Sequence, residues 1–231
     1  DNVIAVSSVA TAEMVKLLEN TFRAVNIGLV NELAIMCDKL GVSVWEVIES
    51  AGTKPFGFMP FYPGPGLGGH CIPIDPLYLS WKLKMLNYNA RFIELASEVN
   101  TQMPEYCLHR IVNVLNQHQK CINGTRILML GLSYKRDVSD VRESPALDIL
   151  RLLEDGGAIV DYSDPYAPEV HIDGIDKKSV NLNHEMVAEY ALVVVVTDHT
   201  CFDYEMVRKA APLVFDTRNV FPEAHDNVVK L

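Results

Sequence analysis

The 231-residue sequence has no long apolar run, no excess of basic residues and no basic N-terminal leader. Its longest apolar run, residues 191–196, is far below the roughly 20 residues that span a bilayer. Lysine and arginine number 20 against 30 acidic residues, a formal net charge of −10. This balance disfavours a nucleic-acid or anionic-membrane partner, but it does not exclude a local basic pocket. The opening residues DNVIAVSSVA do not predict a signal peptide.

Cysteine is also scarce, and its spacing excludes two further classes. The five cysteines are Cys37, Cys71, Cys107, Cys121 and Cys201, which are far apart and form no C-x-x-C pair. An odd, scattered set disfavours both a disulfide framework and a zinc cluster. We therefore expect a protein of the reducing cytoplasm that holds no metal.

The first half of the chain has the period of helices. The largest pattern predicts a helix over residues 11–40, with Thr11 as N-cap and Gly41 as the stop. We expect a buried stripe along it, made of Met14, Leu17, Leu18, Val25, Leu29, Leu33 and Met36. Shorter helices are expected over 44–52, 76–86 with Asp75 as N-cap, and 90–100, which leads through Pro104 into 105–117.

The second half changes period near Asn123-Gly124. Strands are predicted over 126–132, 158–165, 191–197 and 212–217. Helices are predicted between them over 145–157, after an N-cap at Ser144, and over 184–190 and 204–211. Such alternation favours a doubly wound parallel sheet. The expected fold is α/β: an all-helical domain over residues 1–117, followed by a Rossmann-like parallel-sheet domain over 118–231.

A glycine-rich loop, YPGPGLGGHCIPIDP over residues 62–76, raises three alternatives. Gly64, Gly66 and Gly69 fit the dinucleotide fingerprint G-x-G-x-x-G, but prolines precede them where that fingerprint requires a strand. The second alternative is a surface loop with tight turns. The third is a segment whose backbone approaches a ligand closely and places Cys71 beside it. The context disfavours the dinucleotide reading.

Cys71 is the candidate nucleophile of this loop. If Asp75 begins a helix, the thiol lies near its positive end, which favours the reactive thiolate. The alternative is a cysteine that acts only as a small apolar side chain. A metal site at His70 and Cys71 is disfavoured because adjacent side chains rarely bind one ion together.

Two further polar sets have open interpretations. Glu13, Lys16 and Asn20 lie on one side of the first helix, and spacing alone favours a solvated stripe over an amine and amide that face Cys71. In the turn over residues 131–144, Lys135, Arg136 and Arg142 either bind phosphate or are solvated.

Taken together, three segments resemble the UDP-glucose/GDP-mannose dehydrogenase family. They are TAEMVKLLENTFRAVNIGLVNELA, GFMPFYPGPGLGGHCIPIDP and GLSYKRDVSDVRESPALDIL, and the loop ending GGHCIPIDP most resembles the UDP-N-acetylglucosamine 6-dehydrogenase branch. The family has an N-terminal NAD-binding domain, a helical dimerisation domain and a UDP-binding domain. This chain matches the last two, with residues 1–10 similar to the tail of the first. The resemblance therefore implies a fragment that is inactive alone, with NAD held mainly by the missing domain.

The resemblance also implies roles for particular residues. Cys71 matches the catalytic thiol, Lys16 and Asn20 match the lysine and asparagine beside the developing oxyanion, and Asp75 matches an aspartate that positions water. The implied substrate-binding residues are Phe61, Tyr62, Gly64, Gly66, Gly68, Gly69, Tyr134, Lys135, Arg218 and Lys54. Lys54 would reach across a homodimer formed through the helix over 11–40. The implied reaction oxidises the C6 alcohol of a UDP-hexose to a carboxylate.

The sequence does not exclude two other functions. The first is a dimeric UDP-sugar-binding unit without redox activity. The second is an unrelated thiol hydrolase that uses Cys71 with a distant histidine.

Overall fold

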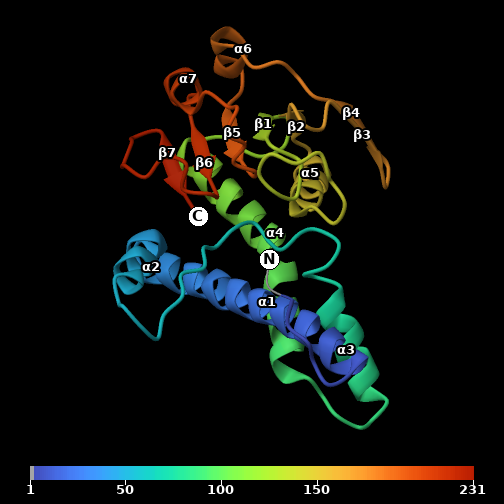
Figure 1. Cartoon of the computed structure of the whole chain (residues 1–231). Helices are drawn as coiled ribbons and strands as arrows, with labels where there is room; N and C mark the ends of the chain where they lie inside the picture. The colour runs from blue at the N-terminus through green and yellow to red at the C-terminus, as the bar shows by residue number, and fades with distance from the viewer. Residues whose placement is uncertain (1–2) are drawn as a thin grey trace.

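The computed structural model describes residues 3–231, in which a helical region and a sheet region share one long helix (Figure 1). The helical region holds α1 (Val9–Leu40), α2 (Val44–Gly52), α3 (Asp75–Lys84) and the first part of α4 (Arg91–Gln117). In Figure 1, α4 runs from this region up to the sheet. Residues 1–2 of the expected N-terminal tail lie outside the described residues.

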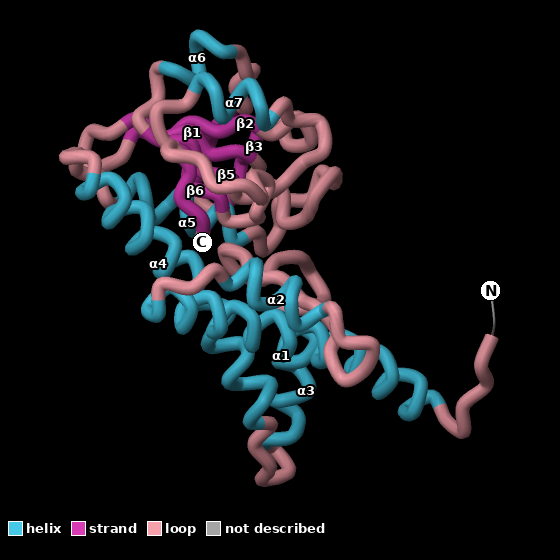
Figure 2. Tube along the Cα trace, turned by 90° about the vertical axis from the view of Figure 1, so that its left-hand side faces the viewer, coloured by secondary structure: helices cyan, strands magenta, loops and turns pink. Residues whose placement is uncertain are grey.

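The long first helix is confirmed, but its predicted cap is wrong. Ser8 is the N-cap: its backbone is extended, with φ −158° and ψ 161°, and the Thr11 backbone N–H donates to its hydroxyl at 3.1 Å. Thr11 already lies inside the helix. Gly41 ends the helix with φ 68°, a left-handed conformation that glycine adopts at low cost. Residues 3–8 and the first turns of α1 project beyond the rest of the helical region (Figure 2).

The buried stripe predicted for α1 is wrong at four of its seven residues, whereas Leu33 packs against a core cluster. Met14, Leu18, Leu29 and Met36 are exposed. The helix instead contacts α4 through small residues, because a Cβ on Gly28 would lie only 3.2 Å from the Cα of Ala96. The three- and four-residue spacing thus indicates a helix correctly, but the buried side of that helix is the one with small side chains.

Helix α4 continues through Pro104 as one helix. Proline has no N–H, so the carbonyl of Asn100 loses its usual helical donor. The glycine loop packs at this point, where a Cβ on Gly66 would lie 3.3 Å from that carbonyl. Beyond the proline, Cys107 and Ile111 pack in the core beneath the sheet. The division at residue 117 stays a prediction.

The sheet region is a doubly wound parallel sheet, as predicted. Its strands are β1 (Arg126–Leu130), β2 (Ile159–Ser163), β5 (Leu192–Val195), β6 (Val214–Asp216) and β7 (Val228–Lys230), in the order β2-β1-β5-β6-β7. Its helices are α5 (Pro145–Asp155), α6 (His184–Ala188) and α7 (Tyr204–Ala210). Ile127 and Met129 pack toward α4 and α5, whereas Leu128 and Leu130 pack toward α7. Helices therefore cover both faces.

Three strands were not predicted. The antiparallel hairpin of β3 (Glu169–Ile172) and β4 (Ile175–Lys178) lies apart from the main sheet, and β7 has only three residues. The hairpin turn is Asp173-Gly174, with φ of 48° and 85°. An Asp-Gly pair between short apolar-containing runs is a strong hairpin signal, so this element was open to prediction.

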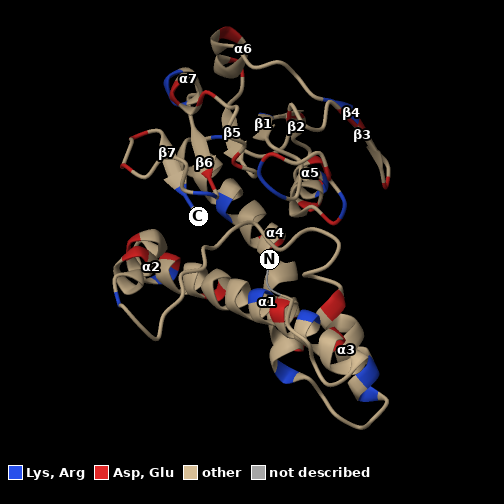
Figure 3. Cartoon of the chain, in the orientation of Figure 1, with Lys and Arg blue, Asp and Glu red and all other residues tan. Residues whose placement is uncertain are grey.

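The chain leaves β1 and β5 toward opposite edges of the sheet, so the switch point of the sheet lies between these two strands. The segments that follow β1 and β6 face the glycine loop, because Tyr134 and Arg218 both approach its glycines. Basic and acidic side chains are interspersed over both regions (Figure 3). Among residues 3–231, no helix is both long and apolar enough to cross a membrane.

Candidate active site

A cavity of about 490 Å³ lies where α1, the glycine loop and the loop after β1 meet. It contains both of the groups that the sequence proposed for catalysis, Cys71 and Lys16. Its lining is Lys16, Asn20, Arg23, Gly68, Gly69, His70, Cys71, Ile72, Tyr134, Asp140 and Arg142. Both halves of the chain therefore contribute to one site.

Helix α1 contributes Lys16, Asn20 and Arg23 at positions i, i+4 and i+7, which share one helix face. The amine of Lys16 is exposed and lies 3.7 Å from Glu19. Asn20 is fully buried. Glu13, which the sequence grouped with Lys16 and Asn20, is exposed and is not part of the cavity lining.

Asn20 links α1 to the first turn of α3. Its Nδ2 donates to Oδ2 of Asp75 at 2.7 Å, and Nη2 of Arg23 donates to its Oδ1. The predicted role of Asp75 as N-cap is wrong: Ile74 occupies that position, without a side-chain capping bond, and Asp75 is the first helical residue. Since the Asp75 carboxylate accepts a hydrogen bond from Asn20, Asp75 holds the start of α3 against α1.

Cys71 lies one turn before α3 and is exposed. Its carbonyl accepts the backbone N–H of Asp75 at 2.9 Å, which ties the cysteine to the first turn of the helix. The thiol thus lies near the N-terminus of α3.

The glycines before Cys71 are needed for close packing against the loop after β1. A Cβ on Gly69, where φ is 89°, would lie 2.7 Å from the ring of Tyr134. A Cβ on Gly68 would lie 2.8 Å from the Glu143 carbonyl. Any larger residue would push the two loops apart, so these two glycines hold Tyr134 against the segment that carries the thiol.

Asp140 and Arg142 line the cavity from the loop after β1. The Arg142 Nε and Nη2 donate to the two carboxylate oxygens of Asp140 at 2.9 and 2.7 Å. These hydrogen bonds lower the pKa of Asp140. The guanidinium is largely exposed and stays charged beside the cavity.

A buried network supports the loop that carries Tyr134. Asp164 and His199 are both fully buried, and Nε2 of His199 donates to Asp164 at 3.1 Å. The Asp164 carboxylate also accepts the backbone N–H groups of Leu132 and Ser133 at 2.8 Å each. Nδ1 of His199 accepts the Asp137 backbone N–H at 2.9 Å. The turn between β1 and α5 is therefore anchored on both sides of Tyr134.

Arg218 lies beneath the glycine loop rather than in the cavity lining. Its Nε donates to the Val196 carbonyl at 2.7 Å, and its Nη1 lies 2.6 Å from the place of a Cβ on Gly64. Burial lowers the pKa of Arg218 to about 10, so the guanidinium is still protonated at neutral pH. On the other side, the Gly64 N–H donates to Asn31 at 2.9 Å, which anchors the loop between the two regions.

The remaining candidate residues lie outside this lining. The ring of Phe61 meets Phe22 edge-on with centroids 5.7 Å apart, and Tyr62 stacks on Trp45 at 6.2 Å. Lys54 and Lys135 are exposed. The structure thus brings Lys16, Asn20, Gly68, Gly69, Cys71 and Tyr134 together in the lining. Asp75 contacts Asn20 of the lining, whereas Gly64 and Gly66 pack against Arg218 and Pro145, which are not part of it.

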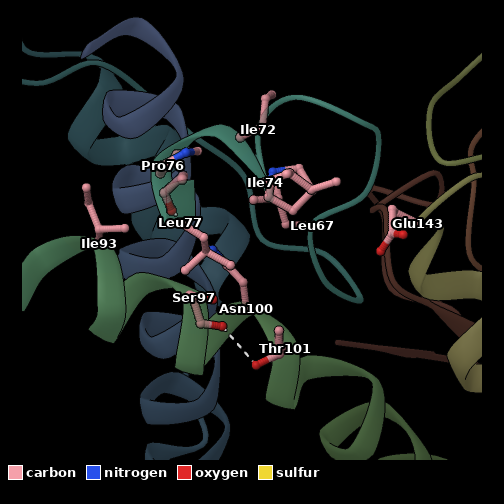
Figure 4. A pocket seen from close by; sticks show the side chains of 12 residues that line it. Leu67, Ile72, Ile74, Pro76, Leu77, Ile93, Ser97, Asn100, Thr101 and Glu143 are labelled. Atoms are coloured by element: carbon pink, nitrogen blue, oxygen red, sulfur yellow. Dashed lines mark hydrogen bonds between the residues drawn. The ribbon is translucent and has the colours of Figure 1, made fainter. Parts of the chain in front are cut away.

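A second, smaller cavity of about 180 Å³ lies behind the same loop (Figure 4). Its lining is mainly apolar, with Leu67, Ile72 and Ile74 from the loop and Ile93 from α4. Ile72 belongs to both linings. Ile72, the residue after Cys71, therefore contacts both cavities.

Sequence reasoning missed Arg23 and left Arg142 undecided between phosphate binding and solvation. Arg23 had a usable signal, because it lies seven residues after Lys16 and so on the same helix face. Asp140 and His70 had none, since only the packing of the two loops brings them to the cavity.

Comparison with known proteins identifies the family of the chain. Residues 10–102 match the central domain, and residues 128–223 the UDP binding domain, of the UDP-glucose/GDP-mannose dehydrogenase family. The UDP-N-acetyl-D-mannosamine dehydrogenase of Methanococcus maripaludis is 38% identical over 220 residues, which is 91% of this chain and 48% of that protein. The UDP-N-acetyl-D-glucosamine 6-dehydrogenase of Pseudomonas aeruginosa is 38% identical over 160 residues, which is 69% of this chain and 37% of that protein.

Solved structures are similar over the same extent. The UDP-D-ManNAc dehydrogenase of Pyrococcus horikoshii has a TM-score of 0.81 and 32% identity, and the match covers 95% of this chain and 51% of that one. The chain spans about half the length of the curated relatives it matches most extensively. On the two domain matches and these relatives, the chain belongs to the UDP-glucose/GDP-mannose dehydrogenase family.

Proposed function

We propose that this chain forms the thiol-bearing and UDP-binding parts of an NAD-dependent UDP-sugar 6-dehydrogenase. The reaction would oxidise the C6 alcohol of a UDP-N-acetylhexosamine to a carboxylate. The observation that supports it best is the convergence of Cys71, Lys16 and Asn20 in one cavity, against the turn that carries Tyr134. The names of the relatives, which specify N-acetylmannosamine, N-acetylglucosamine and N-acetylgalactosaminuronic acid, favour an acetamido sugar.

The charge of the cavity suits such a substrate. Lys16, Arg23 and Arg142 line it with one carboxylate, Asp140, although the chain as a whole carries a net charge of −10. A local excess of cations stabilises negative charge that develops during a reaction. We propose that Tyr134, Lys135 and Arg218 contribute to the UDP end of the site, and that Phe61 and Tyr62 support the loop beside the sugar.

The chemistry that we propose for Cys71 follows from the properties of a thiol. Its thiolate adds to the C6 aldehyde, and the carbonyl oxygen takes a proton to give a thiohemiacetal. The hydroxyl of the thiohemiacetal then loses its proton and the same carbon gives up a hydride, for which NAD⁺ would be the acceptor, and a thioester remains. Water then adds to the thioester carbonyl, and the thiolate leaves as the carboxylate forms. A thiol suits both roles because it is a good nucleophile and a good leaving group.

Lys16 and Asn20 would act on the oxygen bonded to C6. The ammonium of Lys16 and an N–H of Asn20 would donate to this oxygen whenever it carries negative charge, which stabilises the transition states of addition and hydrolysis. Asp75, held by Asn20 at 2.7 Å, would accept a proton from the hydrolytic water.

NAD⁺ would supply the acceptor for two hydrides per sugar. We assign none of its binding residues to this chain. The glycines that fit a dinucleotide fingerprint approach Tyr134, Pro145 and Arg218 too closely to cradle a pyrophosphate. The chain by itself is therefore also a candidate for a UDP-sugar-binding unit that does not oxidise its ligand.

Calorimetry on the chain separates these proposals. We expect UDP and UDP-N-acetylhexosamines to bind, and titration of the N-acetylglucosamine, N-acetylmannosamine and N-acetylgalactosamine forms will rank the sugar. The enzyme that contains this chain should produce two NADH per sugar. Product released without NAD⁺ would favour the thiol hydrolase instead, and absence of UDP binding would reject the family function for this chain.

We also propose a homodimer that forms through α1. Large apolar side chains are exposed on the helical region, among them Leu18 and Leu29 on α1, Trp81 on α3 and Phe92 on α4. An exposed apolar surface of this kind is typical of an interface. A partner subunit on this surface would also place Lys54 near a second copy, as the resemblance implies.

A further inference from the structure

Among the residues that the structure describes, Arg23 is a half-buried cation of the cavity with no acid within 4 Å to balance its charge. Its side chain is half-buried and lines the cavity. Within residues 3–231 no carboxylate lies within 4 Å of its guanidinium, and its Nε is buried without a hydrogen-bond partner. Burying an incompletely paired cation is costly. Packing and ion pairing therefore do not account for an arginine at this position.

The other two cations of the cavity have acidic neighbours. Lys16 lies 3.7 Å from Glu19, and Arg142 donates twice to Asp140. Arg23 has one partner in the described residues, the Oδ1 of Asn20. Its guanidinium is therefore directed at the amide of a residue that we propose to act in the reaction.

The two neighbours of Asn20 allow its side-chain amide only one orientation. A guanidinium can only donate hydrogen bonds, so it must face the amide oxygen. An ionised carboxylate can only accept, so Asp75 must face the amide nitrogen. Reversing the amide would set donor against donor at Arg23 and acceptor against acceptor at Asp75. One of the two Nδ2 hydrogens is then held by Asp75, and the direction of the other is fixed.

We infer that Arg23 is a positioning residue, which holds the Asn20 amide so that its second N–H is available to an oxygen on C6 of the sugar. This inference rests on the proposed function. Asn20 is fully buried, so an amide with the wrong orientation cannot be compensated by water. Arg23 thus acts through Asn20, whereas Lys16 acts through its own charge.

The inference makes a prediction that depends on the ligand. A UDP-uronate carries charged oxygens on C6, and UDP carries none. Loss of Arg23 should therefore weaken binding of the uronate and leave binding of UDP nearly unchanged. A role of Arg23 in general folding would weaken both.

The test is a double-mutant cycle of Arg23→Leu and Asn20→Ala, measured by calorimetry with UDP and with a UDP-N-acetylhexosamine uronate. Each single variant should weaken uronate binding about tenfold, as expected for a hydrogen bond to a charged group, and change UDP binding by no more than about twofold. The double variant should be no weaker than Asn20→Ala alone. Arg23→Lys, which keeps a donor-only cation, should recover part of the loss.

Lys39→Gln, at an exposed position near the end of α1, is the matched control and should change neither affinity. Thermal unfolding shows whether each variant is folded. Additive losses in the double variant would overturn the inference, because Arg23 would then act independently of Asn20. An equal loss for UDP and for the uronate would overturn it as well.

If the wild-type chain binds neither ligand, the proposed function fails, and NMR decides the positioning role separately. In the wild-type chain the side-chain amide protons of Asn20 should exchange slowly with water. Arg23→Leu should speed that exchange about tenfold. Unchanged exchange would show that Arg23 does not hold the amide.

Discussion

The two regions of this molecule differ in how completely they bury their apolar residues. The sheet region fills both faces: Ile127, Leu128, Met129 and Leu130 on the central strand β1 are all fully buried. The helical region has one small cluster around Trp45, whereas Leu18 and Phe92 are 66% and 75% exposed. A sheet with helices on both faces completes its own core, while the α1 helix packs on α4 through small residues and leaves its large ones outside.

This difference parallels the division of work that we propose. The sheet region would provide a stable platform whose loops hold the nucleotide. The helical region provides the thiol, on a loop held between the two regions by contacts such as those of Gly64 with Asn31 and Arg218. The reactive segment is thus fixed by tertiary contacts on both sides, because a loop rich in glycine and proline has no regular structure of its own.

The largest expected effect is that of Cys71→Ser, which should lower the oxidation rate without changing the affinity for the UDP-sugar. In the enzyme that contains this chain, Cys71→Ser should reduce oxidation at least about 1,000-fold, because a hydroxyl is a far weaker nucleophile near neutral pH. Affinity for the UDP-sugar should stay within about twofold. The measurements are NADH formation and calorimetry.

Cys121→Ser is the control, since Cys121 is an exposed cysteine of the sheet region, remote from the cavity lining. Its rate should equal that of the wild type. Oxidation by Cys71→Ser at close to the wild-type rate would remove the thiol from the mechanism.

The next prediction compares how much the sheet region and the helical region each lose in stability when a phenylalanine is removed. Phe215 on β6 is fully buried, and Phe215→Ala should lower the free energy of unfolding by about 3–5 kcal/mol. Phe92→Ala removes the same side chain from an exposed position on α4 and should cost less than about 0.5 kcal/mol in the monomer. Urea unfolding at concentrations where the chain is monomeric measures both. Similar losses would contradict the contrast between the two regions.

Much of this architecture could be predicted from the sequence, because local patterns decide it. Periods of 3.6 and 2, with Ser144 as a helix start and Gly41 as a helix stop, predicted the main helices and four of the five strands of the parallel sheet. The buried side of α1 could not be predicted, because Gly28 packs on Ala96 from a distant helix. The predicted capping role of Asp75 was wrong for a similar reason, because its carboxylate accepts a hydrogen bond from Asn20, 55 residues earlier. Local patterns fix the elements, whereas the site depends on contacts between them.

A third prediction concerns the buried network of the sheet region. Burial raises the pKa of Asp164, but hydrogen bonds from His199 and from the backbone N–H groups of Ser133 and Leu132 outweigh it, and the pKa is about 2. An unfolded aspartate titrates near 3.9, so this carboxylate stabilises the folded state at neutral pH. That stability, on the order of 2 kcal/mol, should be lost as the pH falls from about 5 toward 2.

Asp164→Asn should remove this pH-dependent part of the free energy of unfolding. Urea titrations at a series of pH values compare it with Asp173→Asn, a change at the exposed tip of the β3–β4 hairpin. A wild-type protein whose stability is flat over this pH range would show that the network does not depend on the charge of Asp164.

The smallest expected effect concerns the surface that the helical region leaves exposed. Leu29 on α1 is 58% exposed, so a charge at this position costs the monomer little. If α1 forms the dimer interface, Leu29→Glu buries an unpaired carboxylate twice, once from each copy, and should weaken self-association at least about tenfold. Sedimentation equilibrium measures this change, with Lys39→Gln on the same helix as the control. The proposal would be contradicted if the dimer dissociated equally in both variants, or if the wild-type chain stayed monomeric. The exposed apolar side chains of α1 would then pack against a partner other than a second copy of this helix.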